Sequence, residues 1–553
     1  MKTKKEVARL LKTSLEQALG KLSDFNLEDI ELELPKAKAH GDFSSNLAMK
    51  LARKLKRPPL DIANSIREVI SEKIDEKSIL SSVRIEKPGY INFFLKQGTY
   101  HKFLEGILKN RKGLLNHQDI GKGAKVQIEF VSANPTGPLS VAHGRQAAVG
   151  ESLSRILEAF NFKTTKEYYL NDEGNQINLL GASILARIQE LRNEAYRFPE
   201  GGYEGEYIRD IAREILKRKK QAKYNIDECA DFGLKFIFDT IKKDLDDFGV
   251  KFDVWYSQKS LRKSGNIDKV LKLLKDKGYS YEKDAAVWFA STRFGDDKDR
   301  VLIKSDASAT YITPDIAYHQ DKFKRKFSRV INIWGPDHHG YISRLKAAVE
   351  ALGIDRERLS IIIVQLARIF RGGKPLAMST RKAQYITLRE VMDEVGADVA
   401  KFFFLTRRTD SHLDFDLELA KSQSKENPVY YIQYAYARIF GVFKQAKDKK
   451  IKELPFSKVD LNLLKEEEEA ILLRLIFRFP FSLFTAYKIL DPYPVCQYLI
   501  ELAGEFHKFY DRHKILLEDN LPLANARMAL AKAAGIVISN GLACLAIKSP
   551  ERM

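Results

Sequence analysis

The fold is decided by residues 126–160, VQIEFVSANPTGPLSVAHGRQAAVGESLSRILEAF, where the spacing of the apolar residues changes along the chain. Apolar and polar residues alternate over 126–130, as they do in a β-strand. Pro and Gly interrupt regular structure over 134–138, and apolar residues then recur at helical spacing over 149–160. The stretch therefore predicts a strand, a loop and a helix in succession.

Three further apolar runs have the character of strands and are separated by helical stretches. They lie at Thr164–Leu170, Val330–Trp334 and Leu359–Gln365. Strands that alternate with helices are typical of a parallel α/β sheet, so we expect a Rossmann-type domain whose ligands bind beyond the carboxyl ends of the strands. A charged, mostly helical insertion is expected at about 175–260.

The two ends of the chain differ from this central region. Residues 1–110 mix helical patterns with two strand-like runs that meet at Pro88 and Gly89, which predicts a small α+β domain. From about Glu426 the pattern is helical almost throughout, which predicts an all-α domain. We therefore expect a multidomain α/β protein with domains at 1–110, 120–425 and 426–553.

Charge and composition narrow the function. The 553 residues include 93 Lys and Arg against 74 Asp and Glu, and the net charge of +19 favours a polyanionic partner such as nucleic acid. A Lys-rich surface without such a partner is the alternative. The three cysteines lack C-x-x-C spacing, which argues against a zinc ribbon or a disulfide framework and fits the cytoplasm. No uninterrupted apolar run approaches the roughly 18 residues of a membrane span.

The loop SANPTGPLSVAHGR, residues 132–145, has the features of a phosphate site. It joins a strand to a helix N-terminus, where free N–H groups and the helix dipole attract anions. Pro135, Gly137 and Pro138 shape a turn that a ligand can approach. His143 stands at the start of the helix as a hydrogen-bond donor, although an ordinary turn with a capping histidine is the alternative interpretation.

The same string resembles HIGH, the first signature of class I aminoacyl-tRNA synthetases, in the ANPTGPLHxGH form of the arginine-tRNA ligase family. A second string, MSTRK at 378–382, is similar to the KMSKS signature, and Gly372 and Gly373 before it supply hinge freedom. Further strings that resemble this family cover nearly the whole chain: HGDFSSNLAMKLA (40–52), YYLNDEGNQI (168–177), YITPDIAYH (311–319), WGPDHHGYISRL (334–345) and ELAGEFHKFYDRHKILL (501–517). The resemblance implies an N-terminal tRNA-contacting domain and an anticodon-binding C-terminal domain.

The resemblance assigns an ATP site to the two signatures. Catalytic roles are implied for His143, Ser140, Arg381 and Lys382. The two cations among them can reach the β- and γ-phosphates as charge builds on the leaving pyrophosphate, although an exposed basic loop is the alternative. The residues implied in ATP binding are Pro135, Thr136, Gly137, Pro138, His143, Gly144, Met378, Ser379, Thr380 and Arg381.

An arginine side chain is a planar cation, and its match is a fixed carboxylate, preferably a bidentate one. By resemblance Asp315 takes that role, with Tyr311 four residues earlier stacking on or bonding to the guanidinium. A structural tyrosine and an ordinary helix-face aspartate are the alternative. The residues implied in arginine binding are Glu129, Ser132, Asn134, Tyr311, Asp315, Asp337 and His338.

The resemblance also implies the course of the reaction. The arginine carboxylate attacks the α-phosphate of ATP once tRNA is bound, and the 2′-hydroxyl of the terminal adenosine then takes the arginyl group. Mg²⁺ is expected to arrive with ATP, held chiefly by the phosphates, and the pair His338–His339 lacks the companions of a protein-held metal site. We expect a cytoplasmic monomer whose partners are arginine-accepting tRNA, L-arginine and ATP, with no membrane partner.

Five positions depart from the family pattern. Ser140 and Ala142 stand where histidine and glycine are usual, and Ala377 and Thr380 stand where KMSKS has lysines. Gln258 stands where a glutamate is expected as a second partner for the guanidinium. Two alternatives stay open: a catalytically silent tRNA-binding paralogue, and a class I ligase for a different amino acid. The retained acidic pocket and the NDEGNQI string favour the active arginine enzyme.

Overall fold

The computed structural model describes residues 2–19, 30–35, 38–110, 119–218, 223–376 and 385–553. The chain divides into two compact units. The first unit comprises Met1–Leu114, Gln445–Phe481 and Lys508–Ile536, and the second unit comprises Leu115–Lys444, Ser482–His507 and Val537–Met553. The domain boundaries expected from the sequence stay a prediction.

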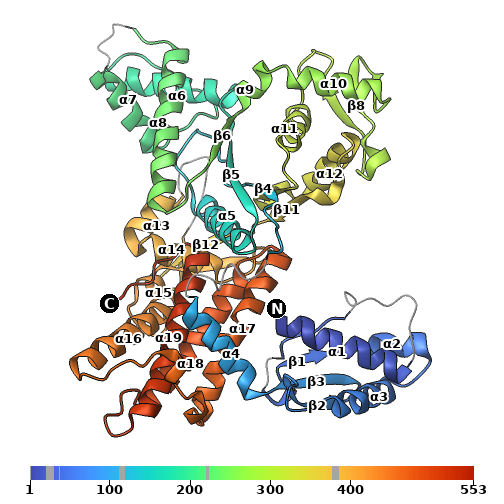
Figure 1. Ribbon diagram of the computed structural model, residues 1–553. Helices are drawn as coiled ribbons and strands as arrows, with labels where there is room; N and C mark the ends of the chain where they lie inside the picture. The colour runs from blue at the N-terminus through green and yellow to red at the C-terminus, as the bar shows by residue number, and fades with distance from the viewer. Residues whose placement is uncertain (1, 20–29, 36–37, 111–118, 219–222, 377–384) are drawn as a thin grey trace. The chain divides into compact units, whose positions relative to one another are not determined.

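The second unit is built on a five-stranded parallel sheet (Figure 1). Its strands, in spatial order, are β11 (Leu359–Ile363), β10 (Arg329–Trp334), β4 (Lys125–Glu129), β5 (Lys163–Leu170) and β6 (Val254–Ser257). All neighbouring pairs are parallel, which confirms the predicted Rossmann-type sheet. The chain continues from β4 to β5 and β6 on one side and then returns to β10 and β11 on the other. The carboxyl end of β4 is therefore the topological switch point, where such sheets bind ligands.

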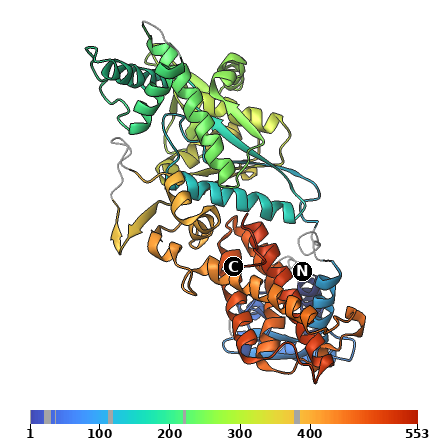
Figure 2. The ribbon, with the colours of Figure 1, turned by 90° about the vertical axis from the view of Figure 1, so that its left-hand side faces the viewer.

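Helix α5 (Val141–Ala159) follows β4 and lies along the sheet (Figure 1, Figure 2). It is buried on most sides, because helix α14 (Ala397–Leu405) also packs against it. Gly150 permits the close approach of α5 to the strand end, since a Cβ at this position would lie 2.3 Å from the ring of Phe130. The predicted succession of strand, loop and helix is confirmed.

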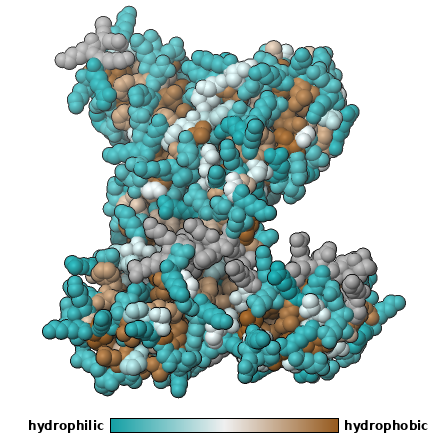
Figure 3. All heavy atoms as spheres, viewed as in Figure 1, coloured by the Kyte–Doolittle hydropathy of each residue, from teal (hydrophilic) through white to brown (hydrophobic). Residues whose placement is uncertain are grey.

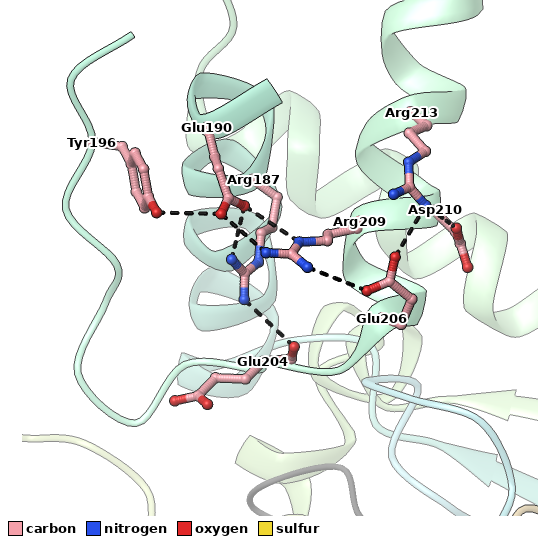
Figure 4. Close-up of polar contacts among 8 residues, drawn as sticks. All are labelled: Arg187, Glu190, Tyr196, Glu204, Glu206, Arg209, Asp210 and Arg213. Atoms are coloured by element: carbon pink, nitrogen blue, oxygen red, sulfur yellow. Dashed lines mark hydrogen bonds and ion pairs between the residues drawn. The ribbon is translucent and has the colours of Figure 1, made fainter. Parts of the chain in front are cut away.

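Three helices separate β5 from β6: α6 (Asn175–Leu191), α7 (Glu206–Arg218) and α8 (Ile226–Asp247). They pack together through buried apolar residues, and hydrophilic side chains lie over much of their outer surface (Figure 3). Ion pairs join α6 to α7, with Arg209 donating to Glu190 at 3.0 Å (Figure 4). The helical insertion is confirmed, although the segment from Val254, expected within it, forms β6 of the main sheet.

Two smaller sheets complete this unit. An antiparallel sheet of β7 (Ser280–Lys283), β8 (Ala286–Phe289) and β9 (Arg300–Ile303) shares a core with α9 (Gln258–Lys263), α10 (Asn266–Asp276), α11 (Ile312–Lys324) and α12 (Ile342–Ala351). The other sheet contains β12 (Ala367–Arg371), β13 (Lys374–Pro375) and β14 (Leu413–Asp416). In sequence, α13 (Leu388–Val395) lies between β13 and β14, and α15 (Leu417–Lys421) follows β14. Helix α11 carries Asp315, the predicted partner of guanidinium.

In the first unit an antiparallel sheet has the strand order β1–β3–β2. The N-terminal part of this unit contains, in chain order, α1 (Lys2–Leu19), β1 (Phe43–Ser45), α2 (Leu47–Leu55), α3 (Pro59–Glu72), β2 (Leu80–Glu86), β3 (Tyr90–Leu95) and α4 (Gln97–Lys109). Phe43 packs edge-on against Phe477 and Phe481, at ring-centroid distances of 6.4 and 5.4 Å. The predicted α+β module, with its turn at Pro88 and Gly89, is confirmed.

The C-terminal region contains four long helices, as the sequence predicts: α16 (Pro428–Asp448), α17 (Glu467–Ile489), α18 (Tyr493–Arg512) and α19 (Leu521–Cys544). Helices α17 and α19 are long and apolar enough to span a membrane by length and composition alone. Within the protein, 50% and 72% of their apolar windows are buried. Packing inside the folded chain therefore accounts for their apolar character.

We expect Gly150→Ala to destabilise the protein by about 1–3 kcal/mol, because the added methyl group overlaps the Phe130 ring and a packed core resists expansion. Gly441→Ala, in α16, is the matched control. Among the described residues no atom lies within 4 Å of its added Cβ, so this change should be neutral or stabilise by about 0.4–1 kcal/mol. Thermal unfolding midpoints test the difference, and equal midpoints for both variants would contradict it.

Candidate active site

The first signature loop (residues 131–140) leaves β4 at the switch point of the sheet. Val131 and Ser132 have φ values of 67° and 39°, a left-handed conformation that is unfavourable for a non-glycine residue and most of all for a β-branched valine. The loop is held in place by a hydrogen bond from Tyr168 Oη to the carbonyl oxygen of Ala133, at 2.8 Å. Backbone strain that neighbours enforce in this way clusters at functional sites, so the geometry marks this loop as a candidate ligand site.

Ser140 and His143 form a capping box at the start of α5. The backbone N–H of Ser140 donates to Nδ1 of His143 at 3.1 Å, and Ser140 Oγ lies at the same distance from that nitrogen. Burial lowers the pKa of His143 to about 4, so the ring is neutral near pH 7. Because Nδ1 accepts a hydrogen bond, the ring hydrogen is on Nε2, from which it can be donated to an anion at the helix N-terminus.

The other predicted residues of this loop differ in their surroundings. Asn134 is exposed, and its Oδ1 accepts a hydrogen bond from Asn171 Nδ2 at 3.3 Å, whereas Pro135 is buried. Gly144 packs inside the protein, since a Cβ there would lie 2.7 Å from the side chain of Leu388. Ligand contacts of these residues stay predictions.

Two tyrosines that the sequence analysis did not single out contact the loop on either side of Gly137. Tyr207 Oη donates to the carbonyl oxygen of Thr136 at 2.8 Å, and Tyr385 Oη donates to that of Pro138 at 2.9 Å. Tyr207 comes from α7 of the helical insertion, and Tyr385 follows the second signature in the chain. No local pattern marks either residue.

Asp315, the predicted partner of guanidinium, lies in the first turn of α11. Its Oδ2 accepts a hydrogen bond from Tyr341 Oη at 2.6 Å. Burial raises the pKa of Asp315 to about 6, although the bond from Tyr341 opposes the shift. A carboxylate that is reluctant to ionise alone is suited to pair with a cation that supplies the missing charge. Tyr341 lies within the string at 334–345, but the sequence analysis gave it no role.

Glu129 lies at the end of β4 and has a buried cation as its partner. Lys322 Nζ, which is fully buried, lies 2.5 Å from Glu129 Oε2 and 2.9 Å from Asn332 Oδ1. The amide of Asn332 lies 2.8 Å from Nε2 of His319, whose Nδ1 is 2.8 Å from the carbonyl oxygen of Asp315. A continuous polar network therefore joins β4 and β10 to α11. Its lysine neutralises Glu129, whose predicted contact with arginine stays a prediction.

The remaining residues predicted to bind arginine are placed as follows. Ser132 Oγ donates to Glu129 Oε1 at 3.1 Å. Tyr311 is 84% exposed, and the described hydrogen bond to the carboxylate of Asp315 comes from Tyr341 instead. Asp337 and His338 are exposed in the 3₁₀ segment Pro336–Tyr341 that ends at Tyr341. The structure therefore brings Ser132 against Glu129, while roles for Tyr311, Asp337 and His338 stay predictions.

Arg145 ties the start of α5 to distant segments. Its guanidinium donates to the backbone carbonyls of Gln365 (2.7 Å), Arg408 (2.8 Å), Ser411 (2.9 Å) and Phe404 (3.4 Å). Burial lowers the pKa of Arg145 to about 10, yet carbonyl oxygens satisfy its donors. The sequence analysis did not select this residue, whose one signal is its position two residues after His143.

The second signature lies outside the described residues, and this includes Met378, Ser379, Thr380, Arg381 and Lys382. Gly372 and Gly373, the predicted hinge, form the turn between β12 and β13 with φ values of 56° and 74°. Both values are in the left-handed region that glycine adopts without steric cost. The roles assigned to the signature cations stay predictions.

Family models match three consecutive parts of the chain. They are the arginyl tRNA synthetase N terminal domain at residues 9–95, the catalytic domain of tRNA synthetases class I (R) at 104–403, and the DALR anticodon binding domain at 432–553. The catalytic model alone covers more than half of the chain, and it includes the first signature loop and Asp315.

Individual proteins agree with these models. The arginine–tRNA ligase of Desulfosudis oleivorans is 46% identical over 542 residues, 97% of each chain, and that of Geobacillus thermodenitrificans is 44% identical over 554 residues, 98% of each chain. The solved structure of Thermus thermophilus arginyl-tRNA synthetase is 18% identical and has a TM-score of 0.74 over 99% of this chain and 100% of that chain, a likeness of fold. The chain belongs to the arginyl-tRNA synthetase family of class I tRNA synthetases.

Proposed function

We propose that this protein activates L-arginine with ATP and transfers it through arginyl-adenylate to its tRNA, releasing AMP and pyrophosphate. The observation that carries this proposal is 46% identity to a curated arginine–tRNA ligase over 97% of the chain. The net charge of +19 supports a polyanionic partner, because phosphate contacts with Lys and Arg provide most of the affinity for a nucleic acid.

The first step joins a carboxylate oxygen of arginine to the α-phosphorus and breaks the bond from that phosphorus to the pyrophosphate oxygen. The substrate is its own nucleophile, so the protein has to align the two groups and stabilise charge. His143 offers a neutral Nε2–H to a phosphate oxygen at the N-terminus of α5. Arg381 and Lys382 are proposed to stabilise the departing pyrophosphate.

Asp315 is proposed to bind the guanidinium of arginine. The pairing of Glu129 with Lys322 supports this role, since it leaves Asp315 as the carboxylate whose described hydrogen-bond partner is a neutral phenol. A guanidinium can donate two parallel hydrogen bonds to such a group. Glu129, Ser132, Asn134, Tyr311, Asp337 and His338 complete the proposed arginine site.

The remaining proposals concern partners and setting. Arginyl-tRNA synthetases are soluble enzymes of translation, and we propose that this one is a cytoplasmic monomer without a membrane partner. Mg²⁺ is proposed to enter with ATP, because this ion keeps much of its water and is usually held by substrate phosphates.

Pyrophosphate exchange tests the function directly. The full-length protein is assayed with each of the twenty amino acids, with and without tRNA. We expect exchange with arginine only, and only when tRNA is present. Exchange with a different amino acid would identify a ligase of other specificity. No exchange, with retained tRNA binding, would identify a catalytically silent paralogue.

We predict that Asp315→Asn lowers kcat/KM for arginine by a factor equivalent to about 2–4 kcal/mol of transition-state stabilisation. This is the cost of removing one partner of a buried charged pair. The KM for ATP should change little. Steady-state kinetics with saturating tRNA measure both, and equal losses for arginine and ATP would instead indicate a structural role for Asp315.

In the wild-type enzyme, kcat/KM for arginine should also decrease at acidic pH. The free Asp315 carboxyl has a pKa of about 6, and its protonated form cannot pair with guanidinium, so kcat/KM for arginine should fall as pH decreases through 6. His143 is neutral over this interval, since its pKa is about 4. Asp315→Asn should lack this titration, and an identical profile in that variant would assign it to another group.

For the second signature, we predict that Arg381→Ala and Lys382→Ala each slow arginyl-adenylate formation by about tenfold to a thousandfold, as expected for loss of one charge-stabilising donor. Thr380→Ala should cost much less, because threonine supplies no charge. Single-turnover rates with saturating tRNA compare the three variants. A larger loss for Thr380→Ala than for both cation variants would contradict the proposed role.

A further inference from the structure

The two tyrosines beside Gly137 constrain the first signature loop at adjacent peptide groups. Tyr207 Oη bonds to the carbonyl of Thr136 at 2.8 Å, and Tyr385 Oη bonds to the carbonyl of Pro138 at 2.9 Å. A Cβ on Gly137 would lie 3.2 Å from Tyr207 Oη and 3.3 Å from Tyr385 Oη, so both hydroxyls contact the loop closely. Glycine is the residue that leaves room for both bonds.

A hydrogen bond that holds a peptide carbonyl also orients the N–H of the same peptide group. In a planar trans peptide the C=O and the following N–H point in opposite directions. The bond to Thr136 therefore orients the N–H of Gly137, and the bond to Pro138 orients the N–H of Leu139. Within the described part of the chain neither of these N–H groups has a hydrogen-bond partner. Each is turned away from a tyrosine hydroxyl, and no described residue accepts the hydrogen bond that it could donate to a ligand.

Each tyrosine is presented by a stable element. The segment of Tyr385 pairs with the loop beyond it, since Leu388 N–H donates to Leu139 O at 2.7 Å and Ser140 and Thr387 form an antiparallel bridge. Burial raises the pKa of Tyr385 to about 12, so its hydroxyl keeps the proton that it donates.

Tyr207 is held through α7. Neighbouring residues of this helix form an ion-pair network with α6, in which Arg209 donates to Glu190 and to Glu206 (Figure 4). Burial also raises the pKa of Tyr207, so this hydroxyl stays protonated too. The helical insertion thus supplies a hydrogen-bond donor to a loop of the main sheet.

We propose that Tyr207 and Tyr385 are positioning residues for ATP. By holding the carbonyls of Thr136 and Pro138, they direct the N–H groups of Gly137 and Leu139 toward the phosphates at the N-terminus of α5. This inference rests on the proposed function, since it takes the first signature loop as the ATP site. Preorganised backbone donors of this kind bind an anion without the cost of ordering the loop.

The test uses Tyr207→Phe and Tyr385→Phe in the full-length protein, because each change removes one hydroxyl and keeps the ring. We expect each variant to raise the Kd for ATP, measured by calorimetry, and the KM for ATP by about threefold to tenfold, the effect of one neutral hydrogen bond. The KM for arginine should change less than twofold. The double variant should raise the Kd for ATP by less than the product of the two single-variant factors, because both hydrogen bonds restrain the same short loop.

Tyr196→Phe is the matched control, since Tyr196 lies in the same insertion, is 46% exposed and donates to Glu190 (Figure 4). It should leave every constant unchanged. Unchanged ATP constants in both test variants, or equal losses for ATP and arginine, would overturn the proposal. A fall in the thermal midpoint that accompanies such equal losses would assign the tyrosines to folding alone. Absence of arginine-dependent exchange in the wild-type protein would refute the proposed function, and the calorimetric Kd would still decide the role of the tyrosines.

Discussion

The buried ion pair between Lys322 and Glu129 is the interaction on which the geometry of this site depends. Lys322 lies on α11 and Glu129 at the end of β4, so the pair joins the helix of Asp315 to the strand that leads into the first signature loop. Removal of one member of such a pair leaves an uncompensated buried charge and costs about 3–5 kcal/mol. The pair therefore fixes the position of α11 relative to the strand end from which the first signature loop begins.

The carboxylates near this pair differ in their partners. Glu129 is neutralised by Lys322, and Glu167 accepts hydrogen bonds from Arg325 and Tyr318. Asp315 lies near these charges and accepts its described hydrogen bond from a phenol; burial raises its pKa, although that hydrogen bond opposes the shift. Of these three described carboxylates, Asp315 is the one without an ion-pair partner, which supports its proposed pairing with a guanidinium.

Two of the departures from the family pattern, Ser140 and Gln258, have described local contacts. Ser140 stands in place of the usual histidine, yet the hydrogen bond to His143 Nδ1 comes from the backbone N–H of this residue. This bond fixes the tautomer of His143 and does not depend on the side chain at position 140. Gln258 lies in a polar network, where it accepts from Tyr169 at 3.2 Å and donates to Glu173 at 3.5 Å. These substitutions change side chains at positions where neighbouring groups maintain the geometry.

The sequence by itself determined the strand, loop and helix at 126–160, the parallel sheet, the helical insertion and both terminal domains, because hydrophobic spacing and Pro and Gly positions act locally. It also selected His143 and Asp315 through signature strings. The partners of these residues depended on tertiary structure. Lys322, Tyr207 and Tyr385 meet the strand and the loop from segments distant in the chain, and nothing in their local sequence separates them from ordinary surface residues. Tyr341 lies in the string at 334–345, which assigned it no role. Only the tertiary packing decided that Lys322 is fully buried, that the three tyrosines are half-buried, and which polar atoms these side chains meet.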